Sequence, residues 1–360
     1  MNVLSLVIIC IFYFYTAILF YITVLSRRKR ETSAFINNLS NSIVLIFSIT
    51  ISIILIQILK ISNTDFIVFP FDIFIIFFII GYFPILYFFI HREKKRIKNQ
   101  DDSWKRYYAV YTQELPLKYE IYRKLTHLVV LAIVFFYFTL GFLVQNVFNY
   151  ILNILPPIIS DLFFSLYNLE GDKMIFTQYL VVFLVGISLI GLITVDLIRI
   201  IRPDYYPLKP VNLILREKEI QTRIGPHISM GVGCFSIIII YGIFQPIGPL
   251  VICTSMTMSI FGDMASNLFG RMVGRRSIRK TKKTYEGLIA GMISSFVSGM
   301  ICLVLLNGLY HISYFGLFIL PLVGAFIIGG LDFLNLEIDD NLSYNVIITP
   351  ILFFLSTILI

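Results

Sequence analysis

The sequence predicts an all-α, polytopic transmembrane helical bundle of about ten spans, because apolar runs long enough to cross a bilayer recur along it. Of the 360 residues, 58% are hydrophobic and 14% are charged, whereas a soluble domain carries about 25% charged residues. The mean hydropathy of +0.87 agrees with this class. We expect the spans at 3–25, 41–60, 67–90, 126–146, 175–197, 227–244, 246–269, 287–307, 315–332 and 343–360.

The distribution of Lys and Arg predicts which ends of the spans face the cytoplasm. Only Lys60 and Lys173 lie outside four basic blocks, and both fall in loops of the opposite parity. Because cytoplasmic loops hold the positive charge of membrane proteins, the four blocks are expected in the cytoplasm and both termini outside. The blocks hold 27 of the 29 basic residues and lie at 27–30, 92–124, 199–223 and 271–283.

Two segments between the spans need separate interpretation. Residues 147–166 are apolar but contain two prolines, two asparagines and Asp161. If they crossed the membrane, the charge rule would fail for every later loop, so we expect an interfacial or re-entrant element on the outer face. The loop 91–124 is basic and carries Trp104 with Tyr107, Tyr108 and Tyr111 close by, which suits an interfacial helix, and a solvated loop is the alternative.

The net charge of +8 also bears on partners. The basic blocks lie directly beside the spans, which indicates attraction to the lipid bilayer and control of topology and not nucleic-acid binding. From Glu114 onward, polar residues recur at the inner ends of the spans. We therefore divide the chain into N-terminal accessory spans, residues 1–110, and a catalytic membrane core, residues 111–360. A single continuous bundle is the alternative.

Four groups of polar residues lie at the predicted inner ends of the spans, so the topology brings them to one side of the membrane. Convergence on one side is what a single site at the inner interface requires. The groups are Arg123, Lys124 and His127; Glu219, Arg223 and His227; Asp263, Asn267, Arg271 and the basic loop to Lys283; and Glu337, Asp339, Asp340 and Asn341.

Asp263 is the central candidate, because an ionisable group inside an apolar run is costly and marks a functional site by default. Asp263 and Asn267 are four residues apart and project from one face of a helix. Carboxylate and amide oxygens suit Mg²⁺, which usually also binds substrate phosphates. The predicted metal ligands are Asp263, Asn267, Asp339 and Asp340. A structural ion pair at Asp263, and a helix cap at Asn341, are the alternatives.

The loop after Asp263 carries seven cations and no acid before Glu286. Such a loop suits a nucleotide triphosphate, because Arg binds phosphate in bidentate fashion, and it also serves as a strong topology signal. Its basic residues are Arg271, Arg275, Arg276, Arg279, Lys280, Lys282 and Lys283.

As a set, these motifs resemble those of the membrane-embedded lipid-alcohol kinases, which include dolichol kinase, phytol kinase and the CTP-dependent diacylglycerol kinase. The resemblance covers roughly residues 120–345, and it rests on the order and spacing of four motifs. They are Arg123-Lys124-x-x-His127, Gly262-Asp263-x-Ala265-x-x-x-x-Gly270-Arg271-x-x-Gly274, Lys283-Thr284-x-Glu286-Gly287 and Asp339-Asp340-Asn341.

The resemblance implies an enzyme that transfers the γ-phosphate of CTP to the hydroxyl of a membrane lipid alcohol, with Mg²⁺ or another divalent cation. A polyprenol or dolichol acceptor fits first, and phytol or diacylglycerol are alternatives. The implied roles are catalysis by Asp263, Lys283, Arg271, Asp340 and His127; nucleotide binding by Arg123, Lys124, Arg271, Lys283 and Glu286; and contact with the lipid hydroxyl by Glu219 and His227.

Two other functions remain open from the sequence. The related phosphatidate cytidylyltransferases share the Lys-Thr-x-Glu-Gly turn and join the cytidylyl group to a lipid phosphate. A lipid or anion transporter would place its polar residues near the bilayer midplane, whereas here they gather at one face. The expected location is the plasma membrane or the endoplasmic reticulum, with the active site facing the cytoplasm.

Overall fold

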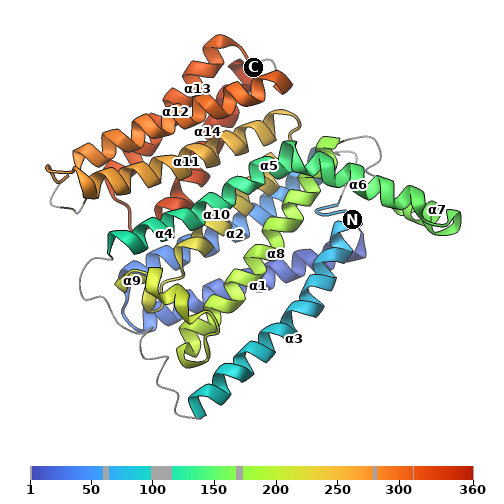
Figure 1. Ribbon diagram of the computed structural model, residues 1–360, viewed down its shortest axis with the longest axis horizontal. Coiled ribbons are helices and arrows are strands. Elements are labelled where there is room, and N and C mark those ends of the chain that lie inside the picture. Colours follow the sequence, from blue (N-terminus) through green and yellow to red (C-terminus); the bar gives the residue numbers. More distant parts are fainter. Residues whose placement is uncertain are drawn as a thin grey trace.

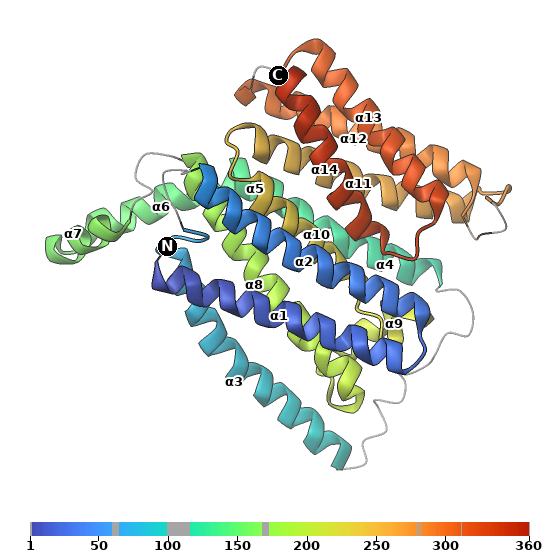
Figure 2. The same cartoon turned by 180° about the vertical axis from the view of Figure 1, so that it is seen from behind.

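The computed structural model describes residues 2–59, 65–98, 116–167, 173–278, 281, 283–310 and 312–359. These residues form a bundle of long helices without a β-strand (Figures 1 and 2). Its helices are α1 (Val3–Arg28), α2 (Thr32–Leu59), α3 (Phe71–Lys98), α4 (Leu117–Leu128), η2 (Val129–Leu131), α5 (Ala132–Phe138), α6 (Leu140–Ile154), α7 (Pro157–Leu166), α8 (Lys173–Ile201), η3 (Pro203–Tyr205), η4 (Lys209–Ile214), α9 (Glu217–Ile220), α10 (Pro226–Tyr241), α11 (Ile247–Met272), α12 (Tyr285–Tyr310), α13 (Tyr314–Leu334) and α14 (Asp340–Leu359).

Within the described residues, nine helical segments are long and apolar enough to cross a membrane, which confirms the predicted all-α polytopic class. The predicted span 227–244 corresponds to α10, which has only 16 residues. At about 1.5 Å per residue this helix is about 24 Å long, shorter than the hydrocarbon core of about 30 Å. α10 packs against α2, α8 and α14, and most of its side chains are buried. Its surroundings are therefore protein and not lipid.

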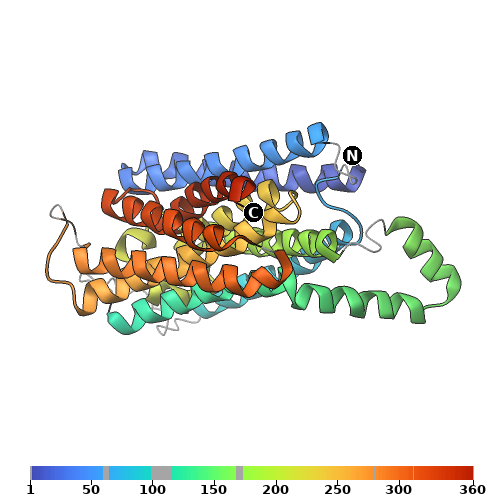
Figure 3. The same ribbon diagram turned by 90° about the horizontal axis from the view of Figure 1, so that it is seen from above.

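The helical segment that begins with α4 and continues through α6 and α7 is longer than the single span predicted at 126–146. α4, η2 and α5 together form a candidate span from Leu117 to Phe138. α6 and α7 then project from the bundle as an apolar arm (Figure 3), with Ile154 and Ile158 65% and 86% exposed. The element predicted not to span, residues 147–166, falls in this arm. The aromatic part of the basic loop, with Trp104, lies outside the described residues.

α11 and α12 pack very closely because small residues recur every fourth position on their facing sides. A Cβ atom built on Gly287 would lie 2.6 Å from the carbonyl oxygen of Ser266, and one built on Gly291 would lie 2.9 Å from the Ser266 Cβ. Only glycine fits such an approach of two helices. This packing fixes α11, which carries Asp263, against the helix that begins just after Lys283.

The α1–α2 hairpin is tied to turns near the far end of the chain by buried asparagines. The Asn37 side-chain oxygen accepts hydrogen bonds from the Asp339 backbone N–H at 2.9 Å and from the Arg223 guanidinium at 3.2 Å. Asn38 accepts from the Ile224 N–H and donates to the Thr222 carbonyl. The N-terminal helices therefore hold two turns that contain predicted site residues.

Candidate active site

The first turns of α4 present a buried polar stripe formed by Glu120, Arg123, Lys124 and His127. Positions i, i+3, i+4 and i+7 share one face of a helix, so the four side chains point the same way. Glu120 is fully buried and accepts hydrogen bonds from Arg123 at 2.6 Å and Arg216 at 3.0 Å. The Arg271 guanidinium lies 3.5 Å from the other Glu120 oxygen. Three arginines from different elements thus surround a single carboxylate.

Asp263 lies beside this cluster, 4% exposed. One of its carboxylate oxygens accepts a hydrogen bond from the Lys124 ammonium and lies 3.9 Å from His127 Nδ1. The other accepts from the Asn267 side-chain amide at 2.9 Å. Asn267 in turn accepts from Arg216 at 3.4 Å. The structure therefore brings together the predicted residues of α4 and α11. Asp263 does form a buried ion pair, which was the alternative interpretation, but its partner is Lys124 and not the neighbouring arginine that was expected.

Glu219, on α9, closes the other side of the arginine cluster. Its carboxylate accepts from Arg123 at 3.3 Å and from the Arg216 backbone N–H at 2.9 Å, and the side chain is 2% exposed. We name Arg123, Lys124, Arg216 and Arg271 the cationic pole. Its four cations face three carboxylates, those of Glu120, Glu219 and Asp263.

A second cluster lies where α13 ends and α14 begins. The Lys283 ammonium donates to Asp332 at 2.6 Å and to Asp340 at 3.4 Å. Asp332 also accepts from Ser266 of α11 at 2.6 Å. We name Asp332, Asp339 and Asp340 the acidic pole, in which the ammonium of Lys283 contacts two of the three carboxylates, those of Asp332 and Asp340. Asp340 interacts electrostatically with Asp263, and Ser266 and Asn267 are neighbours in sequence, so the two poles are adjacent.

Lys283 stays charged over the whole physiological pH range. Burial opposes its charge, but Asp340 and Asp332 outweigh burial and raise the pKa of Lys283 above its ordinary value. A lysine whose folded-state pKa is raised stabilises the fold fully below its ordinary pKa, and this contribution is lost only as the pH rises through the raised value. Lys283 is therefore a permanent cation at the boundary of the acidic pole.

Other predicted residues have different partners. The Asp339 carboxylate accepts from the backbone N–H and side-chain amide of Asn341, and so caps α14. Glu286 accepts from the backbone N–H groups of Arg275 and Arg276 and orders the basic loop. His227 makes no hydrogen bond within the described part of the chain and lies near Asp196 and Arg199. Arg279, Lys280 and Lys282 lie outside the described residues.

The acidic pole and Asp263 offer carboxylate oxygens, the kind of donor that Mg²⁺ prefers. Among the described residues, no three His, Cys, Asp or Glu side chains converge as a complete protein metal cage. Mg²⁺ is usually bound by one or two carboxylates, with substrate phosphates and water completing its shell. Asp340, whose side chain is 27% exposed, is more accessible than the other carboxylates that form ion pairs in the two clusters and fits that partial donor set.

Sequence reasoning missed Glu120, Arg216 and Asp332. Asp332 could have been found, because it is an acid at the end of an apolar run, the criterion that singled out Asp263. Glu120 could have been found from its helical spacing to Arg123, Lys124 and His127. No local signal identifies Arg216, whose partners are on α4 and α11.

We expect the substitution Glu120→Gln to lower the free energy of unfolding by about 3 kcal/mol, because it leaves buried guanidinium groups without their shared carboxylate. Thermal unfolding of the detergent-solubilised protein measures the loss. The matched control is Glu337→Gln, which removes the charge of an exposed acid at the same end of the bundle. Equal unfolding midpoints for the two variants would contradict the central role of Glu120.

The arrangement can bind a polyanion on the cationic pole while carboxylates a few side chains away accept a cation or a proton. The cationic pole joins residues that the sequence places far apart, such as Arg271 and the Glu120 that it contacts, 151 positions from each other. Comparison of the chain with protein-family models, with curated proteins and with solved structures found no match.

Proposed function

We propose that the protein is a CTP-dependent kinase that transfers the γ-phosphate of CTP to the hydroxyl of a membrane lipid alcohol of the polyprenol or dolichol type. The observation that supports this most directly is the adjacency of the cationic and acidic poles. Phosphoryl transfer requires positioning and charge neutralisation more than covalent chemistry by the protein. A site with excess positive charge beside excess carboxylate meets both requirements.

The cationic pole is suited to the phosphates of the nucleotide. Arg216 and Arg271 have side chains 30% and 26% exposed, so their guanidinium groups are accessible to a ligand. Arg123 and Lys124 are buried and hold Glu120, Glu219 and Asp263 in place. In this proposal Arg271 and Lys283 neutralise the triphosphate, and Arg123 and Lys124 fix the geometry around it. The choice of CTP rests on the resemblance of the four motifs.

Asp263 and Asp340 would hold Mg²⁺ together with phosphate oxygens, and the ion would supply neutralisation of the charge that develops on the transferred group. Asp340 would also orient the lipid hydroxyl and accept its proton, since it is the accessible acid. Glu219 is saturated by Arg123 and the Arg216 N–H, which makes it a positioning residue and not a base. His127 lies beside Asp263, and its buried Nε2 has no hydrogen-bond partner among the described residues.

The distribution of charge supports a site at the cytoplasmic interface. The poles lie at one end of the bundle, beside residues of the basic blocks that the sequence contains. Basic blocks of this kind remain on the cytoplasmic side of a membrane. A lipid hydroxyl would reach this end while its tail stays in the bilayer. A transporter is less well supported, because its polar residues would lie near the midplane.

Purified protein supplied with Mg²⁺, a panel of lipid alcohols and CTP labelled at either the γ- or the α-phosphate tests the proposal. We expect label in the lipid fraction only from the γ position, and the labelled lipid identifies the acceptor. Label only from the α position with phosphatidate as acceptor would establish cytidylyl transfer and overturn the kinase assignment. Label from neither position would contradict both activities.

A further inference from the structure

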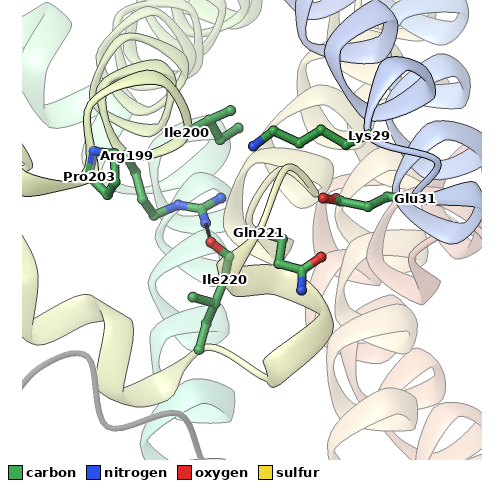
Figure 4. A pocket seen from close by; sticks show the side chains of 7 residues that line it. All are labelled: Lys29, Glu31, Arg199, Ile200, Pro203, Ile220 and Gln221. Atoms are coloured by element: carbon green, nitrogen blue, oxygen red, sulfur yellow. Dashed lines mark hydrogen bonds between the residues drawn. The ribbon is translucent and has the colours of Figure 1, made fainter.

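A pocket of about 570 Å³ lies at the end of the bundle between the α1–α2 turn and the α8–α9 region (Figure 4). Lys29 and Glu31 form one wall. Arg199, Ile200 and Ile220 form the opposite wall, and Gln221 projects between them. The pocket is an open cleft, and its volume lies within the range of small-molecule sites. None of these residues belongs to the cationic or the acidic pole.

The pocket offers an unpaired cation and a partly unpaired anion on the same wall. The Lys29 ammonium makes no hydrogen bond or ion pair within the described part of the chain. One Glu31 oxygen accepts from the Thr222 backbone N–H and hydroxyl, whereas the other has no hydrogen-bond partner among the described residues. Lys29 and Glu31 therefore do not neutralise each other, although they are two residues apart.

Arg199 contributes positive charge to the opposite wall but has no free donor. Its N–H groups bind both Asp196 oxygens and the carbonyls of Glu219, Ile220 and Arg223. In this pocket Lys29 can donate a hydrogen bond to a ligand, and Glu31 can accept one. The side-chain amide of Gln221 can do either. Ile200 and Ile220 add apolar surface beside these polar groups.

The pocket lies at the ends of two candidate membrane spans, α1 and α8. α1 ends at Arg28, and Lys29 is its C-cap, while α8 ends at Ile201. Both helices are candidate membrane spans. The neighbouring Arg27, Arg28 and Arg30 are exposed cations that favour a phosphate-rich surface. A ligand with opposite charges at its polar end and apolar chains behind it therefore matches the site.

We propose that this pocket binds the head group of a membrane phospholipid that carries both a phosphate and a primary ammonium. The phosphate accepts a hydrogen bond from Lys29 and the ammonium donates to the free oxygen of Glu31. The glycerol region and the first methylenes lie against Ile200 and Ile220. A water-soluble phosphoamine shares the same charges but lacks the apolar part.

The experiment titrates the detergent-purified protein with phosphatidylethanolamine, phosphatidylcholine or phosphatidylglycerol of identical chains and measures binding by native mass spectrometry. The ethanolamine lipid should bind most tightly, because choline cannot donate a hydrogen bond and glycerol carries no positive charge. Glu31→Gln keeps an acceptor for Thr222, and it should weaken ethanolamine-lipid binding by about tenfold, the effect of one charge-assisted hydrogen bond. Lys29→Met should weaken the ethanolamine and choline lipids alike.

Arg28→Met is the matched control, because Arg28 is an exposed cation of the same turn that does not line the pocket. Its lipid binding should equal that of the unmodified protein. Equal binding of the three lipids, or equal losses for Lys29→Met and Arg28→Met, would overturn the proposal. An excess of phosphoethanolamine should fail to displace the lipid. If phosphoethanolamine displaced the lipid with an affinity equal to that of the lipid, the ligand would be a soluble phosphoamine, and the proposal of a lipid ligand would be overturned. None of these readouts depends on kinase activity.

Discussion

Replacement of Asp263 by asparagine should lower the turnover of CTP-dependent lipid phosphorylation by about 10³-fold, the loss expected when a preorganised charge at a phosphoryl-transfer site is removed. Asp263 accepts hydrogen bonds from Lys124 and Asn267, which link α4 to α11, and it interacts electrostatically with Asp340 of the acidic pole. Asparagine preserves the shape of the side chain. The variant therefore removes a negative charge and leaves the packing nearly unchanged.

The variant also leaves the Lys124 ammonium buried without its carboxylate, which costs about 3–5 kcal/mol of stability. Turnover must therefore be measured per folded protein, below the unfolding midpoint. Asp196→Asn provides the control, because Asp196 forms another buried pair, with Arg199 at 2.5 Å, and lies outside the set of side chains that contact Asp263. The control should lose comparable stability but retain far more turnover. Equal turnover in the two variants would mean that Asp263 has only a structural role.

The transmembrane class was predictable because lipid contact imposes a local requirement on the sequence. Each helix that crosses the bilayer must be apolar over a length set by the membrane, so an apolar run such as 315–332 can be recognised as a span from the sequence alone. α10 shows the limit of this reasoning. Its apolar run reads as a span, but α10 is 16 residues long and is enclosed by other helices. Burial in protein and burial in lipid select the same side chains.

The residues at the inner ends of the helices were predictable, but their partners were not. The topology predicted from the basic blocks places Lys124 and Asp263 on the same side of the membrane, yet it does not determine which helices are neighbours. The same holds for Lys283, whose 2.6 Å contact is to Asp332 and not to a residue of its own loop. The structural role of Asn37 could not be predicted for a different reason. Asn37 begins the polar stretch Asn37-Asn38-Leu39-Ser40-Asn41 near the start of α2, and its role depends on hydrogen bonds from Asp339 and Arg223, which are far away in the sequence.

The second large effect is expected at Lys283. We expect Lys283→Met to lower turnover by about a hundredfold, because it removes the only ammonium that the described structure places at the acidic pole. In the proposed reaction this ammonium balances charge on the transferred phosphate. Without it, the carboxylates of Asp332 and Asp340 repel both each other and the incoming nucleotide. Lys283→Arg keeps the charge and should recover part of the turnover.

The steady-state constants for CTP and for the lipid alcohol separate a chemical role for Lys283 from a general effect of positive charge. Arg275→Met is the matched control, since Arg275 is an exposed cation of the same loop whose side chain makes no contact with Asp332 or Asp340. Loss of a contact made in the transition state lowers kcat, whereas loss of long-range attraction raises KM for CTP alone. We therefore expect kcat to fall in Lys283→Met and to remain unchanged in Arg275→Met. Equal kinetic constants for the two variants would mean that the acidic pole is only a structural cluster and that Lys283 takes no part in the proposed mechanism.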